Sequence, residues 1–320
     1  MKIVVLDGYT LNPGDLSWER LGMLGELVVY ERTASSKILE RTKGAEIILT
    51  NKTQLKAEIL NQLTSVRYIG VLATGYNVVD IHEAGKLGVV VTNIPAYSTS
   101  SVAQLTFALI LELCHHVQKF SDSVMEGKWS CSVDFTYRDY PLMELESKTI
   151  GIIGFGNIGQ KVCNIASAFG MNVIAFDNHE GRTPACNGSR QVSLEDLMKE
   201  SDIVTVHLPL TPETTGMINK QTLSLMKKTA FFINTSRGAV VVDQDLADAL
   251  NNDLIAGAGL DVLSVEPPPR NNPLLNAKNV VITPHIAWST REARERLMNS
   301  AVTNVEAYLG GNPVNVVNLV

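Results

Sequence analysis

The sequence has few cysteines, only a small excess of negative charge and no long apolar run. Its four cysteines (Cys114, Cys131, Cys163 and Cys186) lack the CxxC spacing of zinc or redox sites, so we expect reduced thiols in a cytoplasmic protein. A net charge of −6 gives no support for binding to nucleic acid or to an anionic membrane. Apolar runs such as residues 107–111 are too short to span a bilayer. No signal-peptide cleavage pattern follows the first strand candidate.

Metal-ligand clusters and internal repeats are also missing from the sequence. His115 and His116 are adjacent, and on a helix their side chains point about 100° apart, so we expect no metal site there. The composition, 45% hydrophobic and 19% charged, is typical of an ordinary globular protein. A length of 320 residues suggests two domains.

The most informative stretch is residues 148–159, where Gly154, Gly156 and Gly159 follow an apolar, partly β-branched run. Helical periodicity follows over residues 160–169, and a second strand candidate over residues 172–176 ends in Asp177. A dinucleotide site needs this order: the first glycine makes a tight turn, the second admits the pyrophosphate, and the third lets helix and strand pack closely. Asp177 would accept hydrogen bonds from the adenosine ribose. The sequence therefore predicts a dinucleotide site rather than an ordinary glycine-rich turn.

Strand and helix patterns alternate on both sides of this stretch, which predicts two parallel α/β units. Residues 98–120 are apolar nearly all round, which predicts one long helix buried between two domains, two subunits or both. The loop of residues 73–77 follows a strand, where open α/β sheets bind ligands. We expect strands at residues 2–6, 27–30, 47–50, 68–72, 89–92, 203–208, 230–234, 256–261 and 280–283, and further helices at residues 56–63, 79–86, 194–199, 244–251 and 290–309.

Five further motifs carry a family resemblance: residues 207–216, 234–243, 257–262, 266–268 and 283–288. With the glycine motif, they make the chain resemble the D-2-hydroxyacid dehydrogenases over essentially its whole length. Residues 101–107 and 285–291 are most similar to the glycerate dehydrogenase (hydroxypyruvate reductase) branch. One position departs from the family pattern, because Asn77 stands where many members have aspartate, and we interpret it as a structural substitution.

The resemblance implies an interrupted domain. A Rossmann NAD-binding domain over residues 100–287 would be inserted into a smaller flavodoxin-like α/β substrate domain, formed by residues 1–99 plus 288–320. It also implies NAD as the cofactor, and we expect a homodimer built on the apolar helix and the aromatic-rich segment after it.

The reduction of a 2-keto acid needs a carboxylate anchor and a proton donor to the ketone oxygen. The resemblance assigns these roles to Arg237, Glu266 and His285. A guanidinium can pair with a carboxylate and polarise the adjacent carbonyl, which suits Arg237. His285 would be the acid–base group. Glu266 would orient the imidazole and favour its protonated form.

Other site residues are implied by the resemblance alone. Thr74 and Gly75 would offer backbone N–H groups to the substrate carboxylate, and Trp288 could pack on a small substrate or belong to the core. The cofactor would contact Asn157, Ile158, His207, Pro209, Thr235, Ser236 and Asp261. Asp261 would lie near the nicotinamide carboxamide, and His207 and Pro209 on the adenine or ribose side, although Pro209 could be a simple loop residue.

The expected reaction is the NADH-dependent reduction of hydroxypyruvate to D-glycerate, and of glyoxylate to glycolate. Phosphoglycerate dehydrogenase is an alternative, although the loop of residues 73–77 offers no cation for a phosphate. A NAD-sensing corepressor is another, because such proteins resemble the same framework. Asp177 predicts NAD over NADP, since its carboxylate would repel a 2′-phosphate, and Arg182 could soften this preference.

Overall fold

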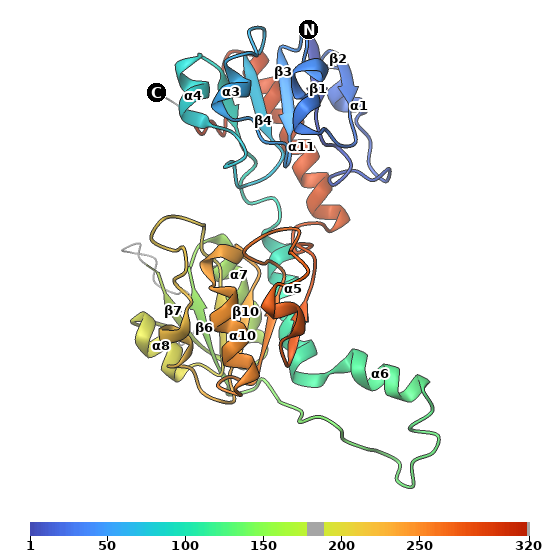
Figure 1. Cartoon of the computed structure of the whole chain (residues 1–320), viewed down its shortest axis with the longest axis vertical. Coiled ribbons are helices and arrows are strands. Elements are labelled where there is room, and N and C mark those ends of the chain that lie inside the picture. The colour runs from blue at the N-terminus through green and yellow to red at the C-terminus, as the bar shows by residue number, and fades with distance from the viewer. Residues whose placement is uncertain (178–188, 319–320) are drawn as a thin grey trace. The chain divides into compact units, whose positions relative to one another are not determined.

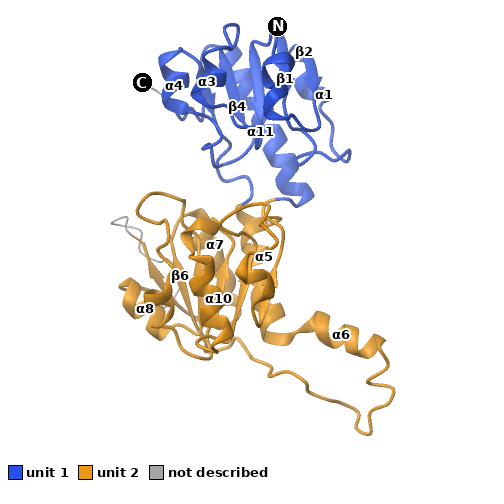
Figure 2. Ribbon diagram, viewed as in Figure 1, with its two compact units in different colours: residues 1–98, 289–320 blue, residues 99–288 orange. Residues whose placement is uncertain are grey.

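Two parallel sheets, each packed against helices, organise the chain (Figure 1). The computed structural model describes residues 1–177 and 189–318. It divides into two units: unit 1 is residues 1–98 with residues 289–320, and unit 2 is residues 99–288 (Figure 2). Both units are α/β, which confirms the predicted fold class.

Unit 1 contains a five-stranded sheet in the order β2-β1-β3-β4-β5, with all neighbours parallel. Its two central strands β3 and β4 are buried along their whole length, because their residues are apolar on both faces. The elements are β1 (Lys2–Val5), α1 (Glu19–Gly22), β2 (Glu26–Val29), α2 (Ile38–Arg41), β3 (Ile47–Thr50), α3 (Ala57–Leu60), β4 (Tyr68–Val71), α4 (Ile81–Lys86), β5 (Val90–Thr92) and α11 (Arg291–Leu309).

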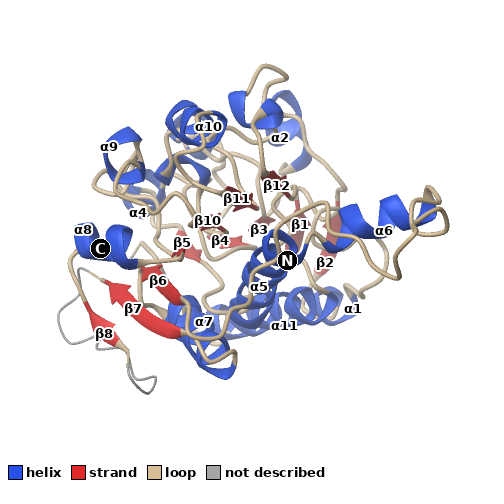
Figure 3. Ribbon diagram, turned by 90° about the horizontal axis from the view of Figure 1, so that it is seen from below, coloured by secondary structure: helices blue, strands red, loops and turns tan. Residues whose placement is uncertain are grey.

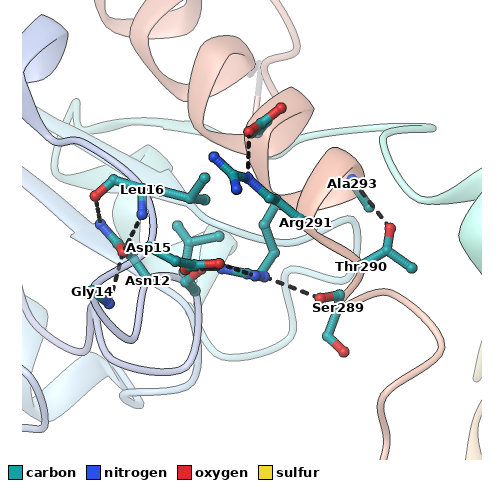
Figure 4. A network of polar contacts seen from close by, with 11 residues as sticks. Asn12, Gly14, Asp15, Leu16, Ser289, Thr290, Arg291 and Ala293 are labelled. Atoms are coloured by element: carbon teal, nitrogen blue, oxygen red, sulfur yellow. Dashed lines mark hydrogen bonds and ion pairs between the residues drawn. The ribbon is translucent and has the colours of Figure 1, made fainter.

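Helix α11 returns the chain to unit 1 and is fastened at its first turn. The Thr290 hydroxyl caps the helix by accepting the Ala293 N–H. A network of polar contacts surrounds Arg294, which is only 8% exposed. Its guanidinium donates to both carboxylate oxygens of Asp15 at 2.7 Å and to the carbonyl oxygen of Ser289 at 3.0 Å (Figure 4). Arg294 thereby ties the loop after β1 to the start of α11.

Unit 2 contains a seven-stranded parallel sheet in the order β12-β11-β10-β9-β6-β7-β8. Helices α5 and α7 cover one core, whereas α8 and α10 cover another on the opposite face (Figure 3). The elements are α5 (Thr99–His115), α6 (Val117–Met125), β6 (Thr149–Ile153), α7 (Asn157–Ala168), β7 (Asn172–Phe176), β8 (Arg190–Gln191), α8 (Leu194–Glu200), β9 (Ile203–Val206), α9 (Lys220–Leu223), β10 (Phe231–Asn234), η2 (Gly238–Val240), α10 (Asp243–Asn251), β11 (Gly257–Leu260), η3 (Pro273–Asn276) and β12 (Val280–Ile282).

The prediction of one helix over residues 98–120 is wrong. His116 lies in the left-handed region at φ 49°, which ends α5 and starts α6 in a new direction. Within the single chain one face of α5 is exposed at Gln104, Ala108 and His115, so burial of that face between two subunits stays a prediction. Helix α6 and the irregular residues 127–141 extend away from the rest of unit 2 (Figure 1). We call residues 117–141 the arm.

The described residues test the predictions for the cysteines, and they show what the structure holds by way of membrane-spanning helices and metal-ligand groups. Cys114 and Cys131 are free thiols, as expected, but Cys163 is disulfide-bonded, so that expectation is wrong for Cys163, and Cys186 lies outside the described residues. Within residues 1–177 and 189–318, no helix combines the length and apolar character needed to cross a membrane. The same residues hold no group of three or more potential metal ligands.

Candidate active site

The glycine loop lies where the strand order of the seven-stranded sheet reverses, between β6 and β9. Gly154 follows β6 at φ 93°, a conformation that favours glycine. A side chain there would meet the His207 carbonyl oxygen at 2.7 Å, and one on Gly159 would meet the Gly154 carbonyl oxygen at 2.3 Å. Gly156 precedes α7 without a side-chain cap, so the N–H groups of Asn157 and Ile158 begin an uncapped helix.

Asp177 ends β7 beside this loop and is 8% exposed. Its Oδ2 accepts the Phe155 N–H at 2.7 Å, which joins the acid to the backbone of the glycine loop. The structure therefore brings together the glycines and the acid that the sequence predicts. Arg182 lies outside the described residues.

His207 follows β9, on the other side of the reversal. Its Nε2 lies 3.0 Å from the Thr205 hydroxyl, and its Nδ1 is buried with no partner among the described residues. Burial lowers the pKa of His207 to about 3, so the ring is neutral at neutral pH, although part of the residue reaches the surface. Pro209, two residues on, is exposed, and its carbonyl oxygen accepts the Thr214 hydroxyl at 2.7 Å.

Arg237, Glu266 and His285 follow three adjacent strands, β10, β11 and β12, at the same edge of the sheet. The turn before Arg237 is set by Asn234, which is 1% exposed. Asn234 Oδ1 accepts the Ser236 N–H at 3.0 Å, and its Nδ2 donates to the Arg237 carbonyl oxygen at 3.1 Å. The Thr235 hydroxyl lies 3.0 Å from that of Thr106 on α5. Asn234 thus orders the residues from Thr235 to Arg237.

Glu266 and His285 form a direct pair. Glu266 Oε2 lies 2.6 Å from Nδ1 of His285, and its Oε1 accepts the Leu263 N–H at 3.2 Å. The imidazole and the carboxyl side chains are 26% and 35% exposed, so the pair is reachable from solvent. With Nδ1 engaged by a carboxylate, Nε2 is the nitrogen left to exchange a proton with a ligand.

Asp261 holds the backbone on which His285 lies. It is 1% exposed at the end of β11, and its carboxylate accepts the N–H groups of Ile286 and Ala287 at 2.9 and 2.8 Å and the Thr283 hydroxyl at 2.5 Å. Burial raises the pKa of Asp261, and these hydrogen bonds oppose the rise. His285 itself lies at φ 54°, a conformation uncommon for a residue with a side chain. Three donors to one carboxylate hold it there.

The remaining predicted substrate residues are placed as follows. Thr74 is exposed, and its hydroxyl donates to the Ile94 carbonyl oxygen at 2.9 Å within unit 1. Gly75 is half-buried in the same loop. Trp288 is half-buried and is the last residue of unit 2.

Comparison with known proteins identifies the family. Residues 107–287 match the D-isomer specific 2-hydroxyacid dehydrogenase, NAD binding domain. The chain is 50% identical to a hydroxypyruvate reductase of Blautia hydrogenotrophica over 99% of this chain and 100% of that one. It is 39% identical to a glycerate dehydrogenase of Methylorubrum extorquens over 99% and 98%. A D-lactate dehydrogenase of Aquifex aeolicus, solved with NAD and lactic acid, has a TM-score of 0.87 at 32% identity over 100% of both chains. The chain belongs to this family.

The chain is therefore an NAD-dependent D-2-hydroxyacid dehydrogenase, as predicted. The geometry of the glycine loop fits the cofactor. A side chain at Gly154 or Gly159 would clash with neighbouring backbone atoms, so only glycine fits at these positions. The uncapped start of α7 offers N–H groups to a pyrophosphate. NAD, when bound, supplies the hydride acceptor or donor.

Several residues that shape this dehydrogenase site carried no separate prediction. Asn234 and Thr106 order the turn before Arg237, and Thr283 binds Asp261. Asn234 lies within a motif that the sequence singled out, and its position at a strand end was the available signal. Thr106 contacts Thr235, 129 residues away, and Thr283 contacts Asp261, 22 residues away. The periodicity of the sequence does not reveal contacts between positions so far apart.

Proposed function

We propose that this dehydrogenase reduces hydroxypyruvate to D-glycerate with NADH, and glyoxylate to glycolate less well. The observation that carries the proposal is the 2.6 Å pair of Glu266 and His285, which follow β11 and β12 at the sheet edge where Arg237 follows β10. An acid–base pair beside a guanidinium suits a 2-keto acid, which presents a carboxylate next to the reacting carbonyl. The similarity to a hydroxypyruvate reductase and a glycerate dehydrogenase supports this substrate.

Each residue has a proposed role. Arg237 pairs with the substrate carboxylate and polarises the ketone oxygen. His285 gives its Nε2 proton to that oxygen during reduction and takes the hydroxyl proton during oxidation. Glu266 orients the ring through Nδ1 and stabilises the positive charge. Thr74 and Gly75 remain predicted contacts of the substrate carboxylate.

The cofactor contacts are proposed from the same geometry. The N–H groups of Asn157 and Ile158 would bind the pyrophosphate, and Gly154, Gly156 and Gly159 would leave room for it. Asp177 binds the adenosine ribose, and His207 and Pro209 lie on the adenine or ribose side. Asp261 would lie near the nicotinamide carboxamide, Thr235 and Ser236 would contact the cofactor, and Trp288 would limit the size of the substrate.

Two alternatives remain open to test. D-3-phosphoglycerate dehydrogenases of Methanocaldococcus jannaschii and Bacillus subtilis are 33% and 36% identical, but this chain spans only 56% and 50% of their length. The absence of a cation from residues 73–77 disfavours a phosphorylated substrate. A NAD-sensing corepressor-like protein would bind the cofactor with little turnover.

A substrate panel tests the proposal. The kcat/KM values of hydroxypyruvate, glyoxylate, pyruvate, a branched 2-keto acid and 3-phosphohydroxypyruvate would be measured with NADH. We expect hydroxypyruvate to give the highest value, followed by glyoxylate. A higher value for pyruvate, the branched acid or the phosphorylated acid would contradict the substrate assignment, and no turnover with any of them would favour the binding protein.

The Arg237→Ala variant tests the anchor independently of the substrate. Every 2-keto acid presents the same carboxylate, so kcat/KM should fall by about 100-fold or more with whichever acid is best. Arg190→Ala is the matched control. Arg190 lies on β8, the edge strand at the other side of the same sheet, and its guanidinium pairs with Glu200. An equal effect of both variants would contradict the role of Arg237.

We also propose a homodimer that uses the arm, and a cytoplasmic location. The arm exposes large apolar side chains at its tip, with Val133 and Phe135 at 101% and 90% exposure. The free thiols of Cys114 and Cys131 support the cytoplasm, whereas the disulfide at Cys163 does not. Cell fractionation with an antibody to the chain tests the location.

A further inference from the structure

We propose that Asp243 is a positioning residue for the acid–base pair, because it fastens both ends of the loop that carries Glu266. The inference rests on the proposed roles of Glu266 and His285. Asp243 ends the motif of residues 234–243 and has no part in the cofactor or substrate contacts proposed above.

The contacts of Asp243 converge on one oxygen. Asp243 is the first residue of α10, and its Oδ2 accepts the Ser264 hydroxyl at 2.6 Å and the Asn272 Nδ2 at 2.7 Å. Ser264 precedes Glu266 by two residues, and Asn272 follows it by six. The carboxylate of Asp243 therefore closes the Glu266 loop at its base.

The loop is exposed between its two ends. Residues 264–271 are all exposed, and among the described residues they form no helix or strand. The residues on either side of this stretch, Leu263 and Asn272, are buried, at 6% and 5% exposure. Asn272 is itself oriented, because its Oδ1 accepts the Leu274 N–H at 3.0 Å and so directs its Nδ2 toward Asp243. Without Asp243, the exposed stretch would lose its side-chain tie between the two ends.

A second support for the loop lies next to Arg237. A Cβ atom on Gly238 would meet the carbonyl carbon and oxygen of Leu263 at 1.9 Å and the Ser264 nitrogen at 2.5 Å. The backbone entering the Glu266 loop thus rests on Gly238 while Asp243 holds the Ser264 side chain. Residues 237–243 therefore carry the guanidinium at one end and support the Glu266 loop at two points.

A carboxylate at this position suits the task. One ionised oxygen accepts two donors, and bonds to a charged acceptor are stronger than neutral ones. The first turn of α10 also favours a negative charge. Two carboxylates face His285, from Glu266 and from Asp261, and Asp243 bonds to neither. Asp243 therefore acts on His285 through the position of Glu266.

The chain supplies a matched control for Asp243. Asp245 lies in the same first turn of α10, and its Oδ2 accepts the Lys220 N–H at 2.8 Å instead of a donor from the Glu266 loop. Both D243A and D245A remove a carboxylate from the same helix start. Only D243A releases the Glu266 loop.

The test measures reduction of hydroxypyruvate by NADH as a function of pH, at matched thermal stability. For D243A we expect kcat to fall about tenfold through misplacement of the pair, with KM changed by less than about threefold. We expect its alkaline limb to move to lower pH by about half a unit or more, because a displaced Glu266 carboxylate favours the protonated imidazole less. D243N should recover part of kcat, since its amide oxygen can still accept both donors. D245A should leave the profile in place.

The double variant D243A/E266Q separates this inference from the proposed function. If Asp243 acts through Glu266, the shift of the alkaline limb caused by D243A should vanish in the E266Q background. If E266Q moves the limb and D243A does not, the inference is overturned and the proposed function stands. If E266Q itself leaves the limb unmoved, the proposed function fails. Should D243A not fold, S264A decides, because it removes one of the two bonds from an exposed residue and should shift the limb in the same direction.

Discussion

His285 donates its backbone N–H to the carbonyl oxygen of Asp261 at 2.8 Å. The Asp261 carboxylate then accepts the next two N–H groups along the chain, from Ile286 and Ala287. Backbone and side chain of one residue therefore fix the left-handed turn that presents the imidazole. The family resemblance placed Asp261 near the nicotinamide, and the geometry adds this second task.

D261N should lower kcat much more than it lowers the affinity for NADH. An amide offers one acceptor oxygen and turns an NH2 group toward backbone donors, so the turn should open. We expect kcat to fall about 100-fold, the loss associated with a displacement of roughly 1 Å. D202N is the control, because Asp202 accepts the Thr149 N–H before β9, at the opposite edge of the same sheet. Stopped-flow reduction with fluorescence titration of NADH checks this, and a loss confined to NADH affinity would contradict it.

E266Q should move the alkaline limb of the reduction profile to lower pH. A carboxylate beside an imidazole stabilises the protonated ring, and glutamine keeps the shape of the side chain while removing the charge. We expect kcat at neutral pH to fall by about tenfold or more. E195Q is the control, since Glu195 pairs with Lys199 on α8. With the hydride step shown to limit the rate by deuterium substitution, an unmoved profile would mean that Glu266 is not the partner of His285.

The enzyme should prefer NADH to NADPH by at least about tenfold in kcat/KM, a difference of about 1.4 kcal/mol. The Phe155 N–H holds the Asp177 carboxylate in place, and at the proposed ribose site that carboxylate would repel a 2′-phosphate. D177S should raise the NADPH to NADH ratio, whereas D196S, which removes an exposed carboxylate on α8, should not. A clear NADPH preference in the unaltered enzyme would contradict the assignment of Asp177.

The sequence predicted the parts of the site that are contiguous in the chain. Thr149 to Asp177 forms one strand–helix–strand unit, so dinucleotide binding could be predicted from the spacing of its residues. The family resemblance predicted roles for Arg237, Glu266 and His285 from local motifs, and the order of the strands that precede them brings the three residues to one edge of the sheet. The tie from Asp243 to Ser264 and Asn272 spans 21 and 29 residues and depends on loop geometry, for which the sequence has no periodic signal.

The break between α5 and α6 could not be predicted for a related reason. Residues 98–120 have uninterrupted helical composition, and a histidine at φ 49° replaces the glycine that normally marks such a break. His116 packs on Tyr140, with ring centroids 4.9 Å apart, and Tyr140 also contacts Phe120. Contacts with the returning chain therefore set the direction of α6, against its local preference.

D15N should destabilise unit 1 at neutral pH and do so less in acid. The hydrogen bond from Arg294 holds the pKa of Asp15 below its ordinary value of 3.8. A carboxyl group with a lowered pKa contributes stability above its unfolded value, and this contribution is lost as the pH falls through the folded value. The difference in melting temperature between D15N and the unaltered protein should thus be present at pH 7 and narrow below about pH 3.8.

The control for this pair is E295Q. Glu295 binds Arg291 one turn along α11, but both side chains are exposed, so we expect almost no change in melting temperature. Arg294, by contrast, is nearly buried and would lose the carboxylate that binds both its terminal nitrogens. Equal melting temperatures for D15N and E295Q at pH 7 would contradict the importance of the Asp15–Arg294 pair.

The arm is the part of the chain through which we expect two copies to associate. Tyr137 and Tyr140 both pack on Phe120, and the Ser123 hydroxyl lies 2.6 Å from that of Tyr137, so the base of the arm is ordered by its own contacts. Val133 and Phe135 take no part in this cluster and remain almost fully exposed in the single chain. Such an apolar tip on an extended arm indicates a protein partner, and a second copy of the chain is the partner that we propose.

F135D should therefore weaken the dimer by at least about 100-fold, because burial of a phenylalanine contributes about 1.5–3 kcal/mol and an unpaired buried carboxylate costs more. Light scattering over a concentration series measures the change. M23D is the control, since Met23 is also exposed, at 73%, but belongs to unit 1. We expect the unaltered protein and M23D to be dimers at micromolar concentration and F135D to be a monomer. A monomeric unaltered protein would contradict the dimer itself, whereas a dimeric F135D would place the interface elsewhere on the chain.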